Sequence, residues 1–197
     1  MEESQFVNLA TSVFAHIQKE YGLRLVTTLN TVHYTNAIVD FTIYYERFFE
    51  IYISFHVEGN NLRLYDAAKW LDIPEENIAL IKRNQVTNAD NMLFVLKNLH
   101  SVMKDVLEKV QLDPNLLSHC LHNRNRYLEE QRLLQSNHDL LIRLQEMWQS
   151  KNFKDFLNLM EANMDIVAKL PSAEKILKQA QYAKKHCTNS TGDGFVC

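Results

Sequence analysis

Four side chains in the N-terminal third of the sequence are of the types that act together in nucleophilic catalysis. They are His33, Asp40, Ser54 and His56. A serine nucleophile needs a histidine base within hydrogen-bond reach and a carboxylate that orients the imidazole. These residues fall in the middle of predicted strands, whereas a triad usually stands on loops and strand ends in a cleft that excludes water. The pattern therefore favours a solvated sheet face over a catalytic centre.

The same predicted face carries the residues of a binding surface. Two tyrosines and a histidine are flanked by two carboxylates, in the set Asp40, Tyr44, Glu50, Tyr52 and His56. Tyrosine is enriched at protein interfaces because it combines a large apolar ring with a polar tip. We expect these five residues to contact another protein.

A second candidate for chemistry lies in the C-terminal half. The segment RLLQSNH, residues 132–138, resembles the Arg-x(4–6)-His motif of helical ribonucleases of the HEPN type. The resemblance implies that Arg132 and His138 cleave RNA together in the cleft of a homodimer. The alternative interpretation makes both residues ordinary polar positions of a helix.

The sequence predicts no bound metal and no cofactor. His119, Cys120 and His122 lie close together in SHCLHN, but a zinc site needs further ligands and this region offers no second Cys/His cluster. Glycine-rich phosphate-binding motifs do not occur in the sequence.

The elements that position the first candidates are a helix and an antiparallel meander. Apolar residues at helical spacing predict a helix that ends near Gly22, and from Leu23 the apolar period changes to two. The strands are rich in β-branched and aromatic residues and their connections are too short for parallel crossovers. We predict three to four strands.

The register of the predicted strands follows from keeping apolar residues on one face. A two-residue turn at Asn36-Ala37 pairs Val32 with Phe41 and places His33 opposite Asp40. A three-residue connection at 46–48 pairs Ile43 with Ile51. On the polar face this register places Asp40 opposite Ser54, Thr42 opposite Tyr52, and Tyr44 opposite Glu50.

The remainder of the chain is predicted to be helical. A short helix is expected near 66–71, a capping box at 87–90 opens a longer one, and Asp113-Pro114 opens another that continues or breaks at QSNHD. Two more helices are expected at 153–164 and 172–186. The fold class is thus α+β, with a helix and sheet in 1–81, a helical bundle on or beside it in 82–187, and a loose tail in 188–197.

Charge and composition narrow the range of partners. Residues 1–81 carry 11 acidic and 5 basic side chains, whereas residues 82–197 carry 13 acidic and 16 basic ones. An acidic N-terminal half suits a partner with a basic surface, and the sequence pI near 6.2 argues against non-specific nucleic-acid binding. The N-terminus lacks the pattern of a secretory signal and no apolar stretch approaches the about 20 residues that span a bilayer. We therefore expect a cytoplasmic protein that does not enter membranes.

These observations favour a non-enzymatic protein-interaction or regulatory protein. A helix followed by an antiparallel meander resembles, in outline and over about the first 70 residues, small bacterial immunity proteins. That resemblance implies a protein target such as a basic, nucleic-acid-cleaving toxin. Two alternatives stay open: the ribonuclease that uses Arg132 and His138, and a sensor that binds a small molecule between the sheet and the helices.

Overall fold

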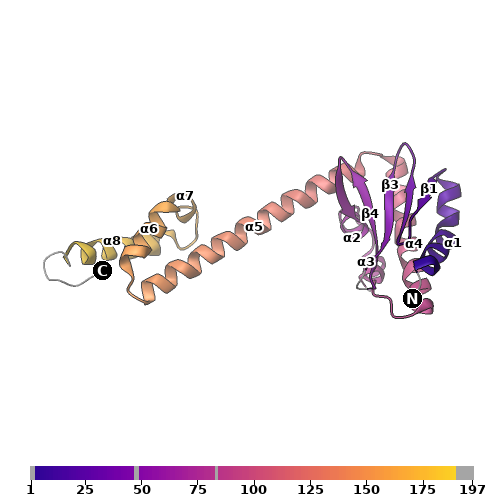
Figure 1. The fold of residues 1–197 in the computed structure, drawn as a ribbon. Helices are drawn as coiled ribbons and strands as arrows, with labels where there is room; N and C mark the ends of the chain where they lie inside the picture. Colours follow the sequence, from indigo (N-terminus) through magenta and orange to yellow (C-terminus); the bar gives the residue numbers. More distant parts are fainter. Residues whose placement is uncertain (1–2, 47–48, 83, 190–197) are drawn as a thin grey trace. The chain divides into compact units, whose positions relative to one another are not determined.

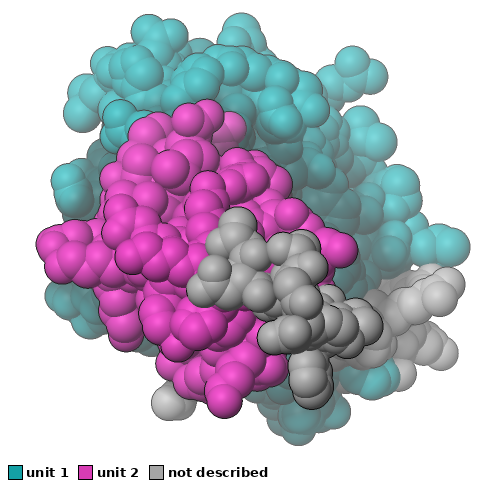
Figure 2. All heavy atoms as spheres, turned by 90° about the vertical axis from the view of Figure 1, so that its left-hand side faces the viewer, with its two compact units in different colours: residues 1–126 teal, residues 127–197 magenta. Residues whose placement is uncertain are grey.

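The computed structural model describes residues 3–46, 49–82 and 84–189, and shows the predicted α+β fold. The chain divides into two compact units, residues 1–126 and 127–197 (Figure 2). The first unit holds α1 (Glu3–Glu20), β1 (Arg24–Thr27), β2 (Thr31–Thr35), β3 (Asp40–Tyr45), β4 (Ile51–Val57), β5 (Asn60–Arg63), α2 (Leu64–Trp70), α3 (Glu75–Ile81), α4 (Ala89–Leu112) and the start of α5 (Leu116–Gln149). The second holds the rest of α5, α6 (Phe153–Ala162), α7 (Met164–Val167) and α8 (Ala173–Asn189).

The five strands form one antiparallel sheet in the order β1-β2-β3-β4-β5, which is a simple meander (Figure 1). The predicted number of three to four strands was too low, because the short segments at the two ends of the meander, β1 and β5, both pair as edge strands. Gly22 has φ of 59° and follows the end of α1, as the sequence predicted for a helix stop.

The turn between β2 and β3 is longer than predicted. Val32 pairs with Ile43 and Tyr34 with Phe41, so the register differs by two residues from the predicted one. The Asn36 side chain explains the difference, because its Oδ1 accepts the backbone N–H groups of Ile38 and Val39, both at 2.8 Å. This side-chain turn stabilises a four-residue connection.

The connection between β3 and β4 also differs by two residues from the prediction. Ile43 pairs with Ile53 rather than with Ile51. Phe49 adopts φ of 57°, and Ile51 N–H donates to the Asn84 carbonyl at 3.0 Å while Val86 N–H donates to the Phe49 carbonyl. Residues 84–86 therefore hold the end of this connection in place, although residues 47 and 48 of the predicted turn lie outside the described part of the chain.

The apolar face of the sheet packs against helices. Figure 1 shows α1 and α4 on one side of the sheet, and both helices contact its strands. The core contains fully buried residues from every layer, among them Phe14, Phe41, Phe55, Leu96 and Val106. The polar residues of the same strands consequently lie on the opposite face, as the alternation predicted.

Three features of the helices differ from the sequence predictions. Residues after Pro74 form α3, a helix that was not predicted. The cap of α4 lies one residue later than predicted, because Asn88 Oδ1 accepts the N–H of Asn91 at 2.8 Å and Asn91 Oδ1 accepts the N–H of Thr87 at 3.0 Å. Helix α5 continues through QSNHD, where Gln135 Nε2 donates to Asp139 Oδ1 at 2.8 Å across one turn.

The second unit has a core of its own. Leu144 of α5, Phe156 and Met160 of α6, and Ile176 and Ala183 of α8 are among its buried residues. The compact units divide within α5. The sequence prediction placed the boundary between the helix and sheet of 1–81 and the helical bundle of 82–187. The predicted tail begins inside α8, which extends to Asn189, and residues 190–197 lie outside the described part. None of the described helices is long and apolar enough to cross a membrane.

Candidate functional site on the polar face of the sheet

The polar face of the sheet brings side chains from four strands together. One row across the sheet consists of His33 on β2, Thr42 on β3, Ser54 on β4 and Arg63 on β5. A second row pairs Tyr44 with Tyr52, and His56 pairs with Asn61. The sequence predicted which residues share this face but placed them opposite the wrong neighbours, since His33 lies opposite Thr42 and not Asp40.

A chain of hydrogen bonds runs through the middle of this face. The Thr42 hydroxyl lies 2.9 Å from His33 Nδ1 and 2.8 Å from His56 Nε2, and His56 Nδ1 lies 2.9 Å from Asn61 Oδ1. If Asn61 Oδ1 accepts, His56 carries its proton on Nδ1, and its Nε2 then accepts the Thr42 proton. Thr42 in turn accepts from His33. The hydrogen bonds of these four side chains can thus all form at once, each donor facing an acceptor in the order His33, Thr42, His56, Asn61.

Asp40 lies beside this chain of hydrogen bonds without joining it. Its Oδ1 is 3.7 Å from His33 Nδ1 and 3.8 Å from His56 Nε2. These distances allow electrostatic attraction to a protonated imidazole but exceed hydrogen-bond lengths. The same oxygen is shielded from solvent and has no hydrogen-bond partner among the described residues. The Asp40 side chain as a whole is partly exposed, so only this one carboxylate oxygen lacks both water and a donor, which is unfavourable.

Ser54 does not complete a catalytic triad. Its side chain is buried, and its Oγ has no hydrogen-bond partner among the described residues, although His56 belongs to the same strand. Both histidines bond to Thr42 instead. A serine without a base in contact is not activated as a nucleophile, so the geometry agrees with the interpretation of these residues as a sheet face.

A second cluster on the polar face is built around two tyrosines. The rings of Tyr44 and Tyr52 stack with centroids 5.0 Å apart, and the Arg63 guanidinium lies 4.6 Å from the Tyr52 ring centre. The Tyr52 hydroxyl donates to Glu46 Oε1 at 2.6 Å. Burial and this hydrogen bond raise the pKa of Tyr52 well above its ordinary value. We call Tyr44, Glu46, Tyr52 and Arg63 the tyrosine cluster.

The sequence predicted part of the tyrosine cluster but not all of it. It selected Tyr44 and Tyr52 but paired Tyr44 with Glu50, which instead forms a bridge with Gln85. Glu46 and Arg63 were missed because one belongs to a turn and the other to a short edge strand. The period-two pattern of the strands could have identified them, since it places Glu46, Tyr52 and Arg63 on the polar face.

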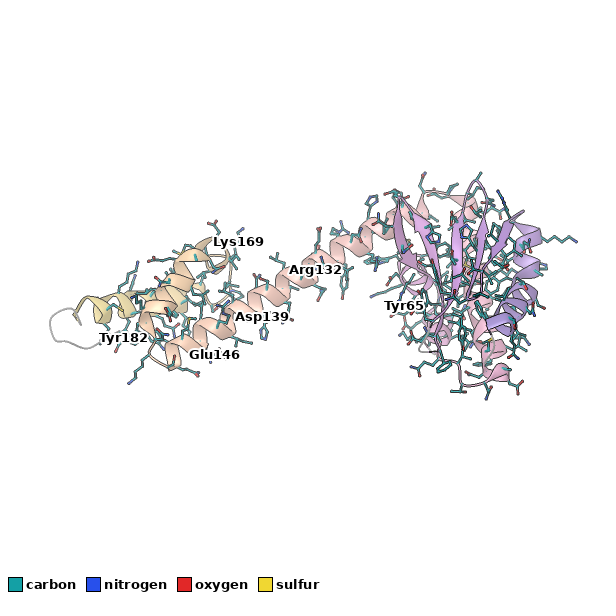
Figure 3. The ribbon with its side chains drawn as sticks, viewed as in Figure 1. Tyr65, Arg132, Asp139, Glu146, Lys169 and Tyr182 are labelled. Atoms are coloured by element: carbon teal, nitrogen blue, oxygen red, sulfur yellow. The ribbon has the colours of Figure 1, made fainter. Side chains whose placement is uncertain are left out.

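Arg132 and His138 both lie on α5 and both are exposed. Six residues on a continuous helix separate two side chains by about 120° around the axis, because each residue turns by about 100°. Arg132 (Figure 3) lines a surface depression with Gln135, Asp139 and Arg143, whereas His138 is not among the lining residues. The described chain therefore does not bring the two side chains together within one molecule, and their meeting in a homodimer stays a prediction.

The sequence offered two other candidates, a metal site around Cys120 and a small-molecule site between the sheet and the helices. Burial raises the pKa of the Cys120 thiol to about 11, so the thiol stays protonated at neutral pH and is a poor metal ligand. A cavity of about 110 Å³ lies between α1, the β2–β3 turn and α4, lined by Tyr21, Asn36 and Leu107 among others. Pockets for drug-sized ligands usually have at least about 300 Å³, so this cavity admits only very small molecules.

Comparison with known proteins gives no further guide to the site. No family model, no curated protein and no solved structure matches the chain.

Proposed function

We propose that the protein is a non-enzymatic interaction protein that binds another protein through the polar face of its sheet. The observation that carries this proposal is the tyrosine cluster, in which two stacked rings, a carboxylate and a guanidinium meet on one face. Aromatic and arginine side chains contribute most of the binding energy in many protein interfaces.

Contacts within the protein itself hold the tyrosine cluster together. Tyr52 is held on three sides, by the stacked Tyr44 ring, by the hydrogen bond to Glu46 and by the Arg63 guanidinium. Side chains that are already ordered lose little conformational entropy on binding. Tyr44 and Tyr52 are only partly buried, so a partner can still contact them.

The acidic groups around the cluster suit a partner with basic side chains. Asp40, Glu46 and Glu50 are each partly or fully exposed on or beside this face. The first unit as a whole has 15 acidic and 12 basic side chains, a net charge of −3, and the second has 9 of each. The overall charge difference is smaller than that between residues 1–81 and 82–197, because Lys82, Arg83, Arg124 and Arg126 belong to the first unit while α4 contributes three acidic and three basic residues. Selection by charge therefore depends on these carboxylates rather than on the whole molecule.

The test is a comparison of binding by two double variants. Wild type, Tyr44→Ala/Tyr52→Ala and the control Tyr65→Ala/Tyr182→Ala are used to capture proteins from a native lysate, and a protein captured by wild type is then purified. We expect the purified partner to bind the control like wild type and the Tyr44→Ala/Tyr52→Ala variant at least about tenfold more weakly. Equal binding by both double variants, or no saturable binding to wild type, would contradict the proposal.

A further inference from the structure

His33, Asp40 and His56 bring three metal-binding atoms together on the polar face. One ligand atom from each residue lies within 4.8 Å of the other two. From this geometry we propose a binding site for a divalent transition metal ion, with two imidazole nitrogens and one carboxylate oxygen as protein ligands. The proposal goes beyond the protein-binding function and does not depend on it.

The spacing of the three atoms is close to that of a metal site. In a tetrahedral site with bonds of about 2.0–2.1 Å, neighbouring ligand atoms are about 3.3 Å apart. The Asp40 oxygen lies 3.7 Å from His33 Nδ1 and 3.8 Å from His56 Nε2. The ligand atoms of the two histidines lie within 4.8 Å of each other. Closing the site around an ion therefore takes side-chain movements of about half an ångström for Asp40 and of up to about 1.5 Å between the two imidazoles, which χ adjustments of the partly exposed rings supply.

The Asp40 carboxylate supplies an independent reason for a cation. Its Oδ1 is shielded from solvent and lacks a hydrogen-bond donor among the described residues. The Asp40 side chain is 41% exposed and its charge is shared by both oxygens, so a positive charge beside Oδ1 would stabilise the oxygen that has neither water nor a donor. An ion placed between the two imidazoles would supply that charge at the atom that needs it.

Asn61 is placed to support His56 as a ligand. A metal-bound histidine usually donates its second ring N–H to a neighbouring oxygen, which sets the tautomer and the ring orientation. His56 Nδ1 lies 2.9 Å from Asn61 Oδ1, and this contact leaves the lone pair of Nε2 directed toward Thr42 and Asp40. His33 must carry its proton on Nε2 so that Nδ1 is free to bind the ion. The Thr42 hydroxyl contacts both nitrogens in the absence of an ion. When the ion binds, this hydroxyl either loses both contacts or becomes a weak further ligand.

The ligand set indicates the class of metal. Imidazole nitrogens favour Zn²⁺, Cu²⁺, Ni²⁺ and Fe²⁺ over Mg²⁺ and Ca²⁺, which prefer oxygen ligands. The side chains of His33, His56 and Asp40 are 30%, 32% and 41% exposed. Three ligands on a partly exposed face leave at least one coordination position for water or another external ligand.

The experiment measures binding of Zn²⁺ and of Co²⁺ to the full chain after treatment with a chelator. Calorimetric titration should saturate at one Zn²⁺ per chain, and Co²⁺ should give visible absorption bands typical of low coordination number. Asp40→Asn and His33→Gln should each weaken Zn²⁺ binding by more than tenfold, and Asn61→Ala by about tenfold, as for other residues that support a ligand.

The control addresses zinc binding by surface histidines in general. His16 lies 3.1 Å from Glu20 and His122 lies 3.5 Å from Glu58, so both are exposed histidines beside a carboxylate. The His16→Ala/His122→Ala variant should bind Zn²⁺ like wild type. The proposal is overturned if wild type shows no saturable site, or if Asp40→Asn and His33→Gln bind Zn²⁺ as wild type does. Because Tyr44 and Tyr52 are untouched, failure here leaves the protein-binding test unaffected.

Discussion

The apolar and polar faces of the sheet are made by alternate residues of the same strands, but different interactions hold them together. On the apolar face, Phe41 stacks on Tyr34 and contacts Phe55 beneath α1 and α4. On the polar face, Thr42, one residue along, bridges two histidines by hydrogen bonds. Burial stabilises the first face, whereas the second gains little net free energy from exchanging water for protein partners.

The contrast shows how one strand can separate stability from recognition. A change on the apolar face should alter the free energy of unfolding and leave the binding groups in place. A change on the polar face should alter binding and leave the fold largely intact. The following substitutions test this separation.

Replacing Phe41 by Ala should have the largest effect. The side chain is fully buried and its removal leaves a cavity between the sheet and the helices. We expect the free energy of unfolding to fall by about 3–5 kcal/mol, measured by urea denaturation. Tyr44→Ala on the same strand should cost less than about 2 kcal/mol. Equal losses would show that the two faces do not differ in their contribution to stability.

Replacing Thr42 by Val should have a smaller effect, because the shape is kept and only the hydroxyl is lost. His33 Nδ1 and His56 Nε2 then lose a hydrogen-bond partner, which water replaces in part since both rings are partly exposed. We expect a loss of about 1 kcal/mol in urea denaturation. Ser54→Ala is the matched control: the Ser54 hydroxyl makes no hydrogen bond among the described residues, so its removal should cost less than that of Thr42.

Removing one tyrosine hydroxyl from each face should give effects of opposite sign. The Tyr34 hydroxyl is buried without a hydrogen-bond partner among the described residues, so Tyr34→Phe should stabilise the protein by up to about 1 kcal/mol. Tyr52→Phe loses the bond to Glu46 at a partly exposed position and should cost about 0.5 kcal/mol. Thermal or urea unfolding of both variants measures the difference, and a loss of stability in Tyr34→Phe would mean that its hydroxyl has a partner such as bound water.

A pH-dependent effect is expected from the helical layer that covers the apolar face. His100 of α4 packs edge-on against Phe14, and its pKa lies below the ordinary 6.5 because of burial, with smaller contributions from His16 and Lys104. The unfolded chain therefore binds a proton more readily than the folded one, and His100 lowers stability as the pH falls below about 6.5. His100→Gln should make the free energy of unfolding less dependent on pH between 7.5 and 5.5. An unchanged slope would show that other groups dominate.

The alternation of residue types predicted the two faces correctly but not the register. A shift of two residues returns every side chain to its own face, so Val32 fits opposite Phe41 or Ile43 equally well by polarity. The Asn36 side chain decided the first turn by accepting two backbone N–H groups. Residues 84–86, more than thirty positions after the second turn, pair with its end. A local pattern could not anticipate that pairing.

The helical half shows the same division between local and distant causes. The start of α4 was predicted to within one residue because its cap is a local exchange of hydrogen bonds between Asn88, Asn91 and the backbone. The helix α3 after Pro74 was missed although Glu75 and Glu76 in its first turn are a local signal for a helix start. With seven residues it is too short for a clear apolar period, and Ile78 and Ile81 are stabilised by packing in the core.

The sequence by itself determined the α+β class and the residues that line each face, because periods of 3.6 and two follow from the geometry of helices and strands. Only the tertiary structure decided which polar residues meet. A register two residues away from the predicted one brings Thr42 between His33 and His56 and Tyr44 opposite Tyr52. The reason is physical: hydrogen bonds in turns and pairing with distant backbone select among registers that hydrophobic burial alone treats as equal.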